Sequence, residues 1–260
     1  MVLRRLGNKS KIAAKIIQYF PAHSIYIEPF FGAGGMFFNK PLTKYNFLND
    51  NDSNVFNLFK VLMNEKEQLT HYIKQAPYHQ DMFKYAKENN GNNNIEKAAL
   101  FLYLSSYSLY GKCDTLKIST GNSKQILINN IDKCYQFLTG CNTQFLNVDF
   151  RKVLSTISIS PEEIKKVFVY ADPPYLGTTD NYEKSFKLND LVDLIELLIG
   201  SGYKFAISEF DTQTSKELAT KYNLNYIKVI ERRSIKNRNI EILMTNFNLN
   251  NSLFDSISLQ

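Results

Sequence analysis

The sequence contains few of the residues that build metal centres and disulfide frameworks. Its 260 residues include three cysteines and three histidines. Cys113, Cys134 and Cys141 form no CxxC pair, and such an odd, sparse set is poor material for a disulfide network or a zinc site. We therefore expect reduced thiols and no bound metal.

Long apolar runs are missing as well. No uninterrupted stretch approaches the roughly 20 residues of a membrane span. The first residues, with Arg4, Arg5, Lys9 and Lys11, lack the apolar stretch of a signal peptide. With 44% apolar residues, a chain of this length can form one large domain, or a core domain with a small insertion. We expect a soluble, cytoplasmic protein with no membrane partner.

Tryptophan is absent, but 16 tyrosines and 19 phenylalanines bring the aromatic content to 13%. The formal net charge is +6 and the pI is about 9.0. This basic excess is compatible with a polyanionic partner such as nucleic acid. Because many soluble proteins share it, the distribution of the charge along the chain is more informative than its sum.

Seven short apolar runs have the length and composition of β-strands. They are residues 25–28, 45–49, 144–148, 167–171, 204–208, 226–230 and 240–246. Apolar residues at helical spacing lie between the earlier runs and at 191–199, where we expect Gly200 and Gly202 to end a helix. The short link between the last two runs predicts an antiparallel hairpin. The pattern predicts a doubly wound α/β domain with a seven-stranded, mostly parallel sheet.

The stretch from residue 65 to residue 140 has a different character. Helical patterns surround the polar run 89–94, and Lys112, Lys117 and Lys124 follow among glycines and polar residues. Such a segment is typical of an exposed hairpin or loop in an insertion that carries its own contact surface. Lysines in a loop are, however, most often simply solvated.

The segment Asp172-Pro173-Pro174-Tyr175 directly follows the fourth predicted strand. Two consecutive prolines remove two backbone donors and prevent the strand from continuing. The Asp172 carboxylate and the Pro173 carbonyl can accept both hydrogens of an exocyclic amine, and Tyr175 offers a flat face to a planar ring. On its own, the segment is equally consistent with a turn at the end of a strand.

The ends of the first three predicted strands also carry candidate site residues. The first runs into a loop with Gly32 and Gly34, where backbone can approach a ligand closely, although the pattern is not the GxGxxG of dinucleotide folds. Asp50 follows the second strand at the place where α/β cofactor folds bind a ribose, and a helix-capping role is the alternative. Asp149 and Phe150 follow the third strand.

With these segments in this order, the sequence resembles the Dam-type, alpha-group DNA adenine-N6 methyltransferases, which use S-adenosylmethionine. The segments that carry the resemblance are 27–35, 48–52, 148–150 and 172–175, together with Arg233, Ser234, Arg238, Glu241, Leu243 and Asn246. The resemblance implies a Rossmann-like methyltransferase fold, with a catalytic domain formed by residues 1–64 and 141–260. It also implies that residues 65–140 form a helical target-recognition insertion that binds DNA.

The resemblance assigns roles to particular residues. The implied cofactor-binding residues are Arg5, Lys9, Glu28, Phe30, Gly32, Gly34, Asp50, Asp149, Phe150 and Asp172. Among them, Lys9 and the glycine loop would face the methionine end of S-adenosylmethionine, Asp50 the ribose and Asp149 the adenine amine. The implied catalytic residues, which would hold the target base, are Asp172, Pro173, Pro174 and Tyr175. The candidates for DNA contacts are Lys112, Lys117, Lys124, Arg232, Arg233 and Arg238.

The chain departs from the family pattern in two places. Arg5 stands where the Dam pattern has an aromatic residue, and the insertion lacks the arginine-rich pattern associated with GATC recognition, so we assign no target sequence. The expected partner is double-stranded DNA in a bacterial or phage-infected cell, and the presence of a cognate restriction endonuclease is left open. The alternatives are a cytosine-N4 methyltransferase, an enzyme acting on RNA and a catalytically silent DNA-binding subunit of the same fold.

Overall fold

The computed structural model describes residues 2–5, 7–118, 120–176, 186–233 and 238–248. In these ranges, seven strands form one sheet in the order β3-β2-β1-β4-β5-β7-β6. The strands are β1 (Ile25–Glu28), β2 (Tyr45–Asn49), β3 (Thr143–Leu146), β4 (Val167–Ala171), β5 (Lys204–Phe210), β6 (Asn225–Arg233) and β7 (Arg238–Thr245). Strands β1 to β5 are parallel, and β7 lies antiparallel between β5 and β6. The predicted α/β fold is confirmed, with its antiparallel hairpin at the end of the sheet.

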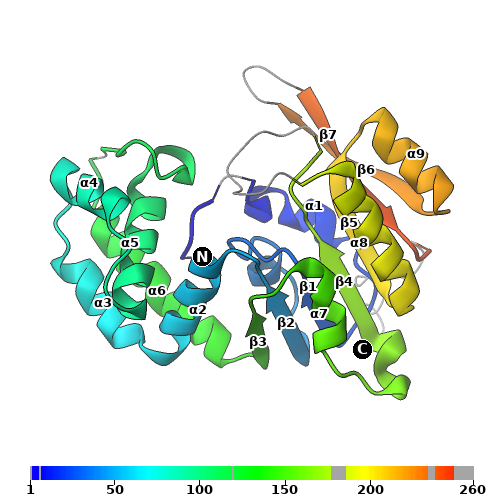
Figure 1. Ribbon diagram of the computed structural model, residues 1–260, viewed down its shortest axis with the longest axis horizontal. Helices are drawn as coiled ribbons and strands as arrows, with labels where there is room; N and C mark the ends of the chain where they lie inside the picture. The colour runs from blue at the N-terminus through cyan, green and yellow to red at the C-terminus, as the bar shows by residue number, and fades with distance from the viewer. Residues whose placement is uncertain (1, 6, 119, 177–185, 234–237, 249–260) are drawn as a thin grey trace.

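Helices cover both faces of the sheet (Figure 1). They are α1 (Ala13–Ile17), α2 (Ser53–Asn64), α7 (Phe150–Thr156), α8 (Leu188–Ser201) and α9 (Gln213–Lys221). Along β1, Tyr26 packs in the cluster that contains α1 and α2, whereas Ile27 packs in the cluster that contains α7, α8 and α9. Successive strand residues point to opposite faces. Because both faces of the sheet are buried, the central strand β4 is apolar throughout.

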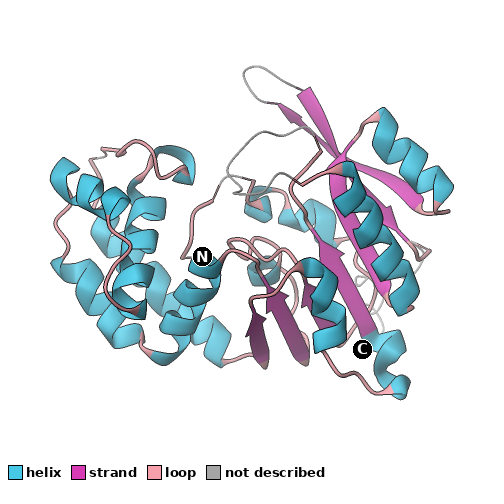
Figure 2. Cartoon of the chain, in the orientation of Figure 1, coloured by secondary structure: helices cyan, strands magenta, loops and turns pink. Residues whose placement is uncertain are grey.

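The predicted insertion forms four helices, α3 (Lys66–Gln75), α4 (Gln80–Glu88), α5 (Asn94–Tyr107) and α6 (Ser123–Thr139). Figures 1 and 2 show them gathered beyond the β3 edge of the sheet. Helix α5 packs against α2, so the apolar core runs without a break from the sheet into this helical group. None of the helices in the described part of the chain has the length and hydropathy of a membrane span.

Three local expectations differ from the structure. The third strand ends at Leu146 rather than at residue 148, because the backbone of Val148 bonds to the side chain of Asn49 instead of continuing the ladder. Gly200 lies inside α8, and only Gly202, with φ of 70°, ends the helix. Ile12, Ile16, Ile17 and Phe20 lie at helical spacing, which predicts a helix over 12–20. The structure has only the short α1 there, preceded by the 3-10 turn η1 (Lys9–Lys11).

Candidate active site

The candidate residues meet at one edge of the sheet, where the parallel strands β1 to β4 end. Parallel strands that are in register have their carboxyl ends on the same side, which is where open α/β folds bind ligands. Segments that are far apart in the sequence, such as 29–35 and 172–175, are therefore neighbours here. We call this the carboxyl edge.

Asn49 joins three of the strand ends. Its side-chain nitrogen donates to the carbonyl oxygens of Pro29, at 2.9 Å, and Val148, at 3.0 Å. Its side-chain oxygen accepts a hydrogen bond from the backbone nitrogen of Val148 at 3.0 Å. The side chain is 1% exposed, so these bonds are protected from water. Sequence reasoning missed Asn49, for which the available signal was an amide at the end of an apolar strand.

Asp50 holds the glycine loop in place. One carboxylate oxygen accepts a hydrogen bond from the backbone nitrogen of Gly32 at 2.6 Å, and the other accepts from that of Asp52 at 2.9 Å. Gly32 has φ of 54°, a conformation that glycine adopts without steric cost. Burial raises the pKa of Asp50, whereas the nearby guanidinium of Arg5, which pairs with Asp52 at 2.9 Å, acts in the opposite direction.

The glycine loop packs directly on the start of the chain. A Cβ atom on Gly35 would lie 2.1 Å from the side-chain oxygen of Asn8 and 2.9 Å from the backbone nitrogen of Lys9. The same oxygen of Asn8 accepts the backbone nitrogen of Ser10 at 3.0 Å and caps η1. This close contact, which only glycine permits, fixes Lys9 at the carboxyl edge.

Lys9 makes the central ion pairs of the site. Its ammonium nitrogen lies 2.8 Å from Asp172 Oδ1 and 3.3 Å from Glu241 Oε1, and 4.4 Å from the centre of the Tyr175 ring. Lys9 is 4% exposed and Glu241 is fully buried. Burial raises the pKa of Asp172, and the positive charge of Lys9 opposes that rise. Glu241 was not among the predicted site residues; its signal was a carboxylate in the otherwise apolar run 240–244.

Tyr175 is anchored by residues of β5 and β7. Its hydroxyl donates to Glu241, and its ring packs nearly perpendicular to that of Phe210, with 4.4 Å between centroids. The next backbone nitrogen, of Leu176, donates to Glu209 at 3.5 Å. Burial raises the pKa of Glu209 to about 7. Glu209 is a second buried carboxyl group that sequence reasoning missed.

Pro173 is buried and Pro174 is partly buried, so both prolines stay next to Asp172 at the end of β4. Glu28, another predicted cofactor residue, is 2% exposed at the end of β1. Its carboxyl group accepts a hydrogen bond from the hydroxyl of Tyr26 at 2.8 Å, and burial raises its pKa well above the ordinary value. Glu28 therefore belongs to the buried layer beneath the site.

Aromatic rings line the carboxyl edge next to Asp149. The ring of Phe30 lies 5.4 Å from that of Phe150, and the ring of Phe186 lies 5.9 Å from both. Asp149 accepts the backbone nitrogen of Arg151 at 3.0 Å and caps α7. Phe150 was predicted as part of the site, whereas Phe186 was missed because it lies in a polar stretch far along the chain. Gly34, with φ of 74°, turns the loop between these rings and Lys9.

The lysines predicted to contact DNA have different surroundings. Lys112 and Lys117 are exposed on a loop that one antiparallel bridge, Ser108 to Leu116, holds together. The ammonium group of Lys124 instead donates to the carbonyl oxygen of Lys74 at 3.0 Å, within the helical group. The loop thus presents two of the three lysines to solvent.

The basic link between β6 and β7 is described only in part. Arg232 and Arg233 are the last residues of β6, and Arg238 is the first of β7. Their side chains, like residues 234–237, lie outside the described part of the structure. Their predicted contacts to DNA thus remain predictions.

The side chains at the carboxyl edge fit a cofactor that contains adenosine. Asp50 can accept the two hydroxyls of a ribose, the rings of Phe30 and Phe150 match a flat base, and Asp149 can accept hydrogen from an exocyclic amine. The positive-φ turns at Gly32 and Gly34 let backbone pass close to such a ligand. In the described ranges, no group of three or more His, Cys, Asp or Glu side chains is placed to hold a metal ion.

Comparison with known proteins gives one family match and several relatives. Residues 6–235 match the D12 class N6 adenine-specific DNA methyltransferases. A DNA adenine methylase of Salmonella typhi is 26% identical, with 90% of this chain and 88% of the relative covered. A DNA adenine methylase of Escherichia coli strain K12 is 25% identical with the same coverage. The retron Ec67 DNA adenine methylase of Escherichia coli is 24% identical, with 90% and 85% covered.

Proposed function

Because the chain belongs to the D12 class N6 adenine-specific DNA methyltransferase family, we propose that it moves the methyl group of S-adenosylmethionine to the N6 amine of a flipped adenine in double-stranded DNA. Asp172 to Tyr175 hold the target base, residues 1–64 and 141–260 form the catalytic domain, and residues 65–140 recognise the target. The observation that supports this most is the ion pair of the buried Lys9 with Asp172, 2.8 Å apart at the end of β4.

The cofactor binds at the ends of β1, β2 and β3, beside the target base at the end of β4. Asp50 binds the ribose hydroxyls, Asp149 accepts the adenine amine, and Phe30 and Phe150 contact the base. Lys9 and the glycine loop lie at the methionine end. When bound, the cofactor supplies an electrophilic methyl group on a sulfonium.

Adenine N6 is a poor nucleophile because its lone pair is delocalised into the ring. The Asp172 carboxylate and the Pro173 carbonyl accept one amine hydrogen each, which favours the pyramidal geometry that frees the lone pair. They also stabilise the partial positive charge that develops on nitrogen during attack. The reaction therefore depends on positioning more than on acid or base strength.

Lys9 keeps Asp172 in the form that this role requires. Burial favours the neutral form of a carboxyl group, which accepts hydrogen bonds only weakly. The ammonium group at 2.8 Å favours the carboxylate, while the raised pKa of Asp172 equips it to take the amine proton late in the reaction. Asp172 thus orients the amine first and accepts a proton second.

A base inside a duplex cannot reach this edge, so the target adenine must leave the helix. Tyr175 stacks on the extruded base, and the hydrogen bond from the Tyr175 hydroxyl to Glu241 sets the angle of the tyrosine ring. Unstacking costs about a few kcal/mol, which contacts to phosphates and grooves must supply. Lys112 and Lys117 lie on a loop that also exposes Tyr110 (79%) and Ile118 (85%), a combination suited to DNA.

Substitution of Asp172 tests the chemical assignment. Asp172→Asn and Asp172→Ala remove the carboxylate, and we expect the single-turnover rate of methyl transfer to duplex DNA to fall on the order of 10²-fold or more. Binding of S-adenosylhomocysteine and the thermal unfolding profile should show that the variants are folded. Glu162→Gln, an exposed carboxyl group before β4, is the matched control. Turnover within a few-fold of the wild type in Asp172→Ala would contradict the role.

Analysis of the methylated product tests which base the protein modifies and whether its substrate is DNA or RNA. Duplex DNA that the protein has methylated, digested to nucleosides, should contain N6-methyl-2′-deoxyadenosine and no N4-methyl-2′-deoxycytidine. Duplex RNA should incorporate little methyl group. Methyl on cytosine would instead support the alternative chemistry. Mapping of modified adenines in bacterial cells that express the protein would identify the target sequence.

A further inference from the structure

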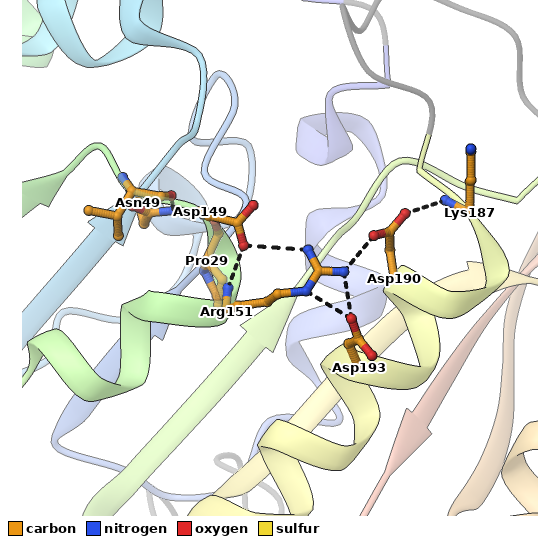
Figure 3. Close-up of polar contacts among 8 residues, drawn as sticks. Pro29, Asn49, Asp149, Arg151, Lys187, Asp190 and Asp193 are labelled. Atoms are coloured by element: carbon orange, nitrogen blue, oxygen red, sulfur yellow. Dashed lines mark hydrogen bonds and ion pairs between the residues drawn. The ribbon is translucent and has the colours of Figure 1, made fainter.

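Arg151 is the centre of a polar cluster at the carboxyl edge (Figure 3). From the first turn of α7 it reaches two carboxylates of α8. Its Nη2 atom lies 2.6 Å from Asp190 Oδ1 and 2.6 Å from Asp193 Oδ2, and its Nε donates to the same oxygen of Asp193 at 2.8 Å. The guanidinium also lies 4.4 Å from the centre of the Phe150 ring.

The same guanidinium faces Asp149. Its Nη1 atom lies 3.5 Å from Asp149 Oδ1, the oxygen that already caps α7. Among the described residues, Asp149 Oδ2 has no hydrogen-bond partner, and Figure 3 shows it directed away from Arg151. The carboxylate is thereby held through one oxygen, which leaves the other for an incoming donor.

Asp190 ties this cluster to the start of α8. Its Oδ2 atom accepts the backbone nitrogen of Lys187 at 2.7 Å, while its Oδ1 atom bonds to Arg151. The residue before Lys187 is Phe186, whose ring contacts Phe150. Arg151 therefore connects α7, α8 and the aromatic rings that line the proposed adenine site.

We infer that Arg151 is a positioning residue for recognition of the cofactor's adenine. It holds Asp149 so that Oδ2 accepts a hydrogen of the exocyclic amine, and Asp190 and Asp193 hold Arg151 in turn. Contact with three carboxylates at once from Nε, Nη1 and Nη2 needs the planar, branched guanidinium of arginine, which lysine does not have. This inference rests on the proposed function, because it takes Asp149 as the acceptor of that amine.

Two ligands that differ at this amine test the inference without catalysis. Calorimetry would compare S-adenosylhomocysteine with S-inosylhomocysteine, in which a carbonyl oxygen replaces the amino group. We expect the wild type to prefer the adenosine form at least about tenfold, since a hydrogen bond to a charged acceptor is lost with the inosine form. In Arg151→Ala the preference should fall to about threefold or less, because Asp149 is no longer held.

Matched variants separate positioning from stability. Asp149→Ala should abolish the preference, Asp190→Asn and Arg151→Lys should reduce it in part, and Lys152→Ala, an exposed change on the same helix, should leave it intact. A purely structural tie between α7 and α8 would weaken both ligands equally and leave the ratio unchanged in Arg151→Ala, which would overturn the inference. An equal affinity of the wild type for both ligands would overturn the adenine assignment of Asp149 as well.

Discussion

Among the described residues, the buried carboxyl groups of Glu209 and Glu241 and the partly buried carboxyl group of Asp172 lie near the buried ammonium group of Lys9. Burial and the neighbouring carboxylates raise the pKa values of Asp172 and Glu209. At the scale of single residues, the raised pKa values of Asp172 and Glu209 make the charge of the site depend on pH.

Glu209 gives a measurable consequence for stability. Its pKa in the folded chain is about 7, above the ordinary value of 4.5, so the folded state binds this proton more tightly than the unfolded state. The resulting stabilisation is complete below about pH 4.5 and is lost as the pH rises toward 7. Between pH 5 and pH 8, the wild type should lose about 2 to 3 kcal/mol of unfolding free energy relative to Glu209→Gln.

Urea unfolding of both proteins at the two pH values would measure this difference. Glu162→Gln, which removes an exposed carboxyl group, controls for the general effect of pH on the charge of the chain. If the difference in unfolding free energy between Glu209→Gln and the wild type is the same at both pH values, Glu209 does not have a raised pKa.

At the scale of elements, the glycine loop and η1 act as one unit. Gly35 lies so close to Asn8 and Lys9 that any side chain would displace them. Because Lys9 pairs with Asp172, the packing of a loop after β1 controls the electrostatics of a loop after β4. The insertion is also connected to the start of the chain, because the backbone nitrogen of Arg4 donates a hydrogen bond to the side-chain oxygen of Ser105 in α5.

Gly35→Ala should therefore affect both stability and ligand binding. A Cβ atom 2.1 Å from the oxygen of Asn8 forces the two segments apart, which we expect to cost about 1 to 3 kcal/mol of unfolding free energy. Affinity for S-adenosylhomocysteine should fall together with stability. Gly200→Ala is the contrasting control, because Gly200 lies inside α8 with open space around it; there we expect a gain of up to about 1 kcal/mol. Equal effects at the two glycines would contradict this account.

At the scale of the molecule, the N-terminal segment links the insertion to the carboxyl edge. A Cβ atom on Gly111 would lie 2.7 Å from the carbonyl oxygen of Arg4, and the next residue, Arg5, pairs with Asp52 after β2. The loop that exposes Lys112 and Lys117 is thereby held close to the strand that carries Asp50. The contact between this loop and the residues after β2 therefore runs through Arg4 and Arg5.

DNA binding provides the test at this scale. Each phosphate contact that is lost should lower the slope of log affinity against log salt by about 0.9. We expect Lys112→Ala with Lys117→Ala to weaken binding to duplexes of any sequence and to reduce that slope by up to about 2. Lys165→Ala, an exposed lysine before the amino end of β4, should have no effect. An unchanged slope in the double variant would remove this loop from the DNA interface.

Local chemistry accounts for the parts of the protein that were predictable. The apolar run Val167–Ala171 can only be a buried strand, two prolines must end it, and the order of acidic strand ends follows from the parallel connections. For these reasons the α/β fold, the antiparallel hairpin and the candidate residues Asp50, Asp149 and Asp172 could be predicted before any coordinates. Glycine in a helix is a weaker signal, and Gly200 was wrongly expected to end α8.

The remaining part of the site depends on contacts between distant residues, which leave no periodic signal in the chain. Glu241 meets Tyr175 across 66 positions, and Arg151 meets Asp193 across 42. Nothing near Gly35 in the sequence indicates that it must make room for Asn8. Sequence patterns therefore placed Asp172 at the end of a strand, whereas packing of strands and helices brought Lys9 and Glu241 to it and Arg151 to Asp149. Side chains from separate elements become neighbours only when the sheet has formed.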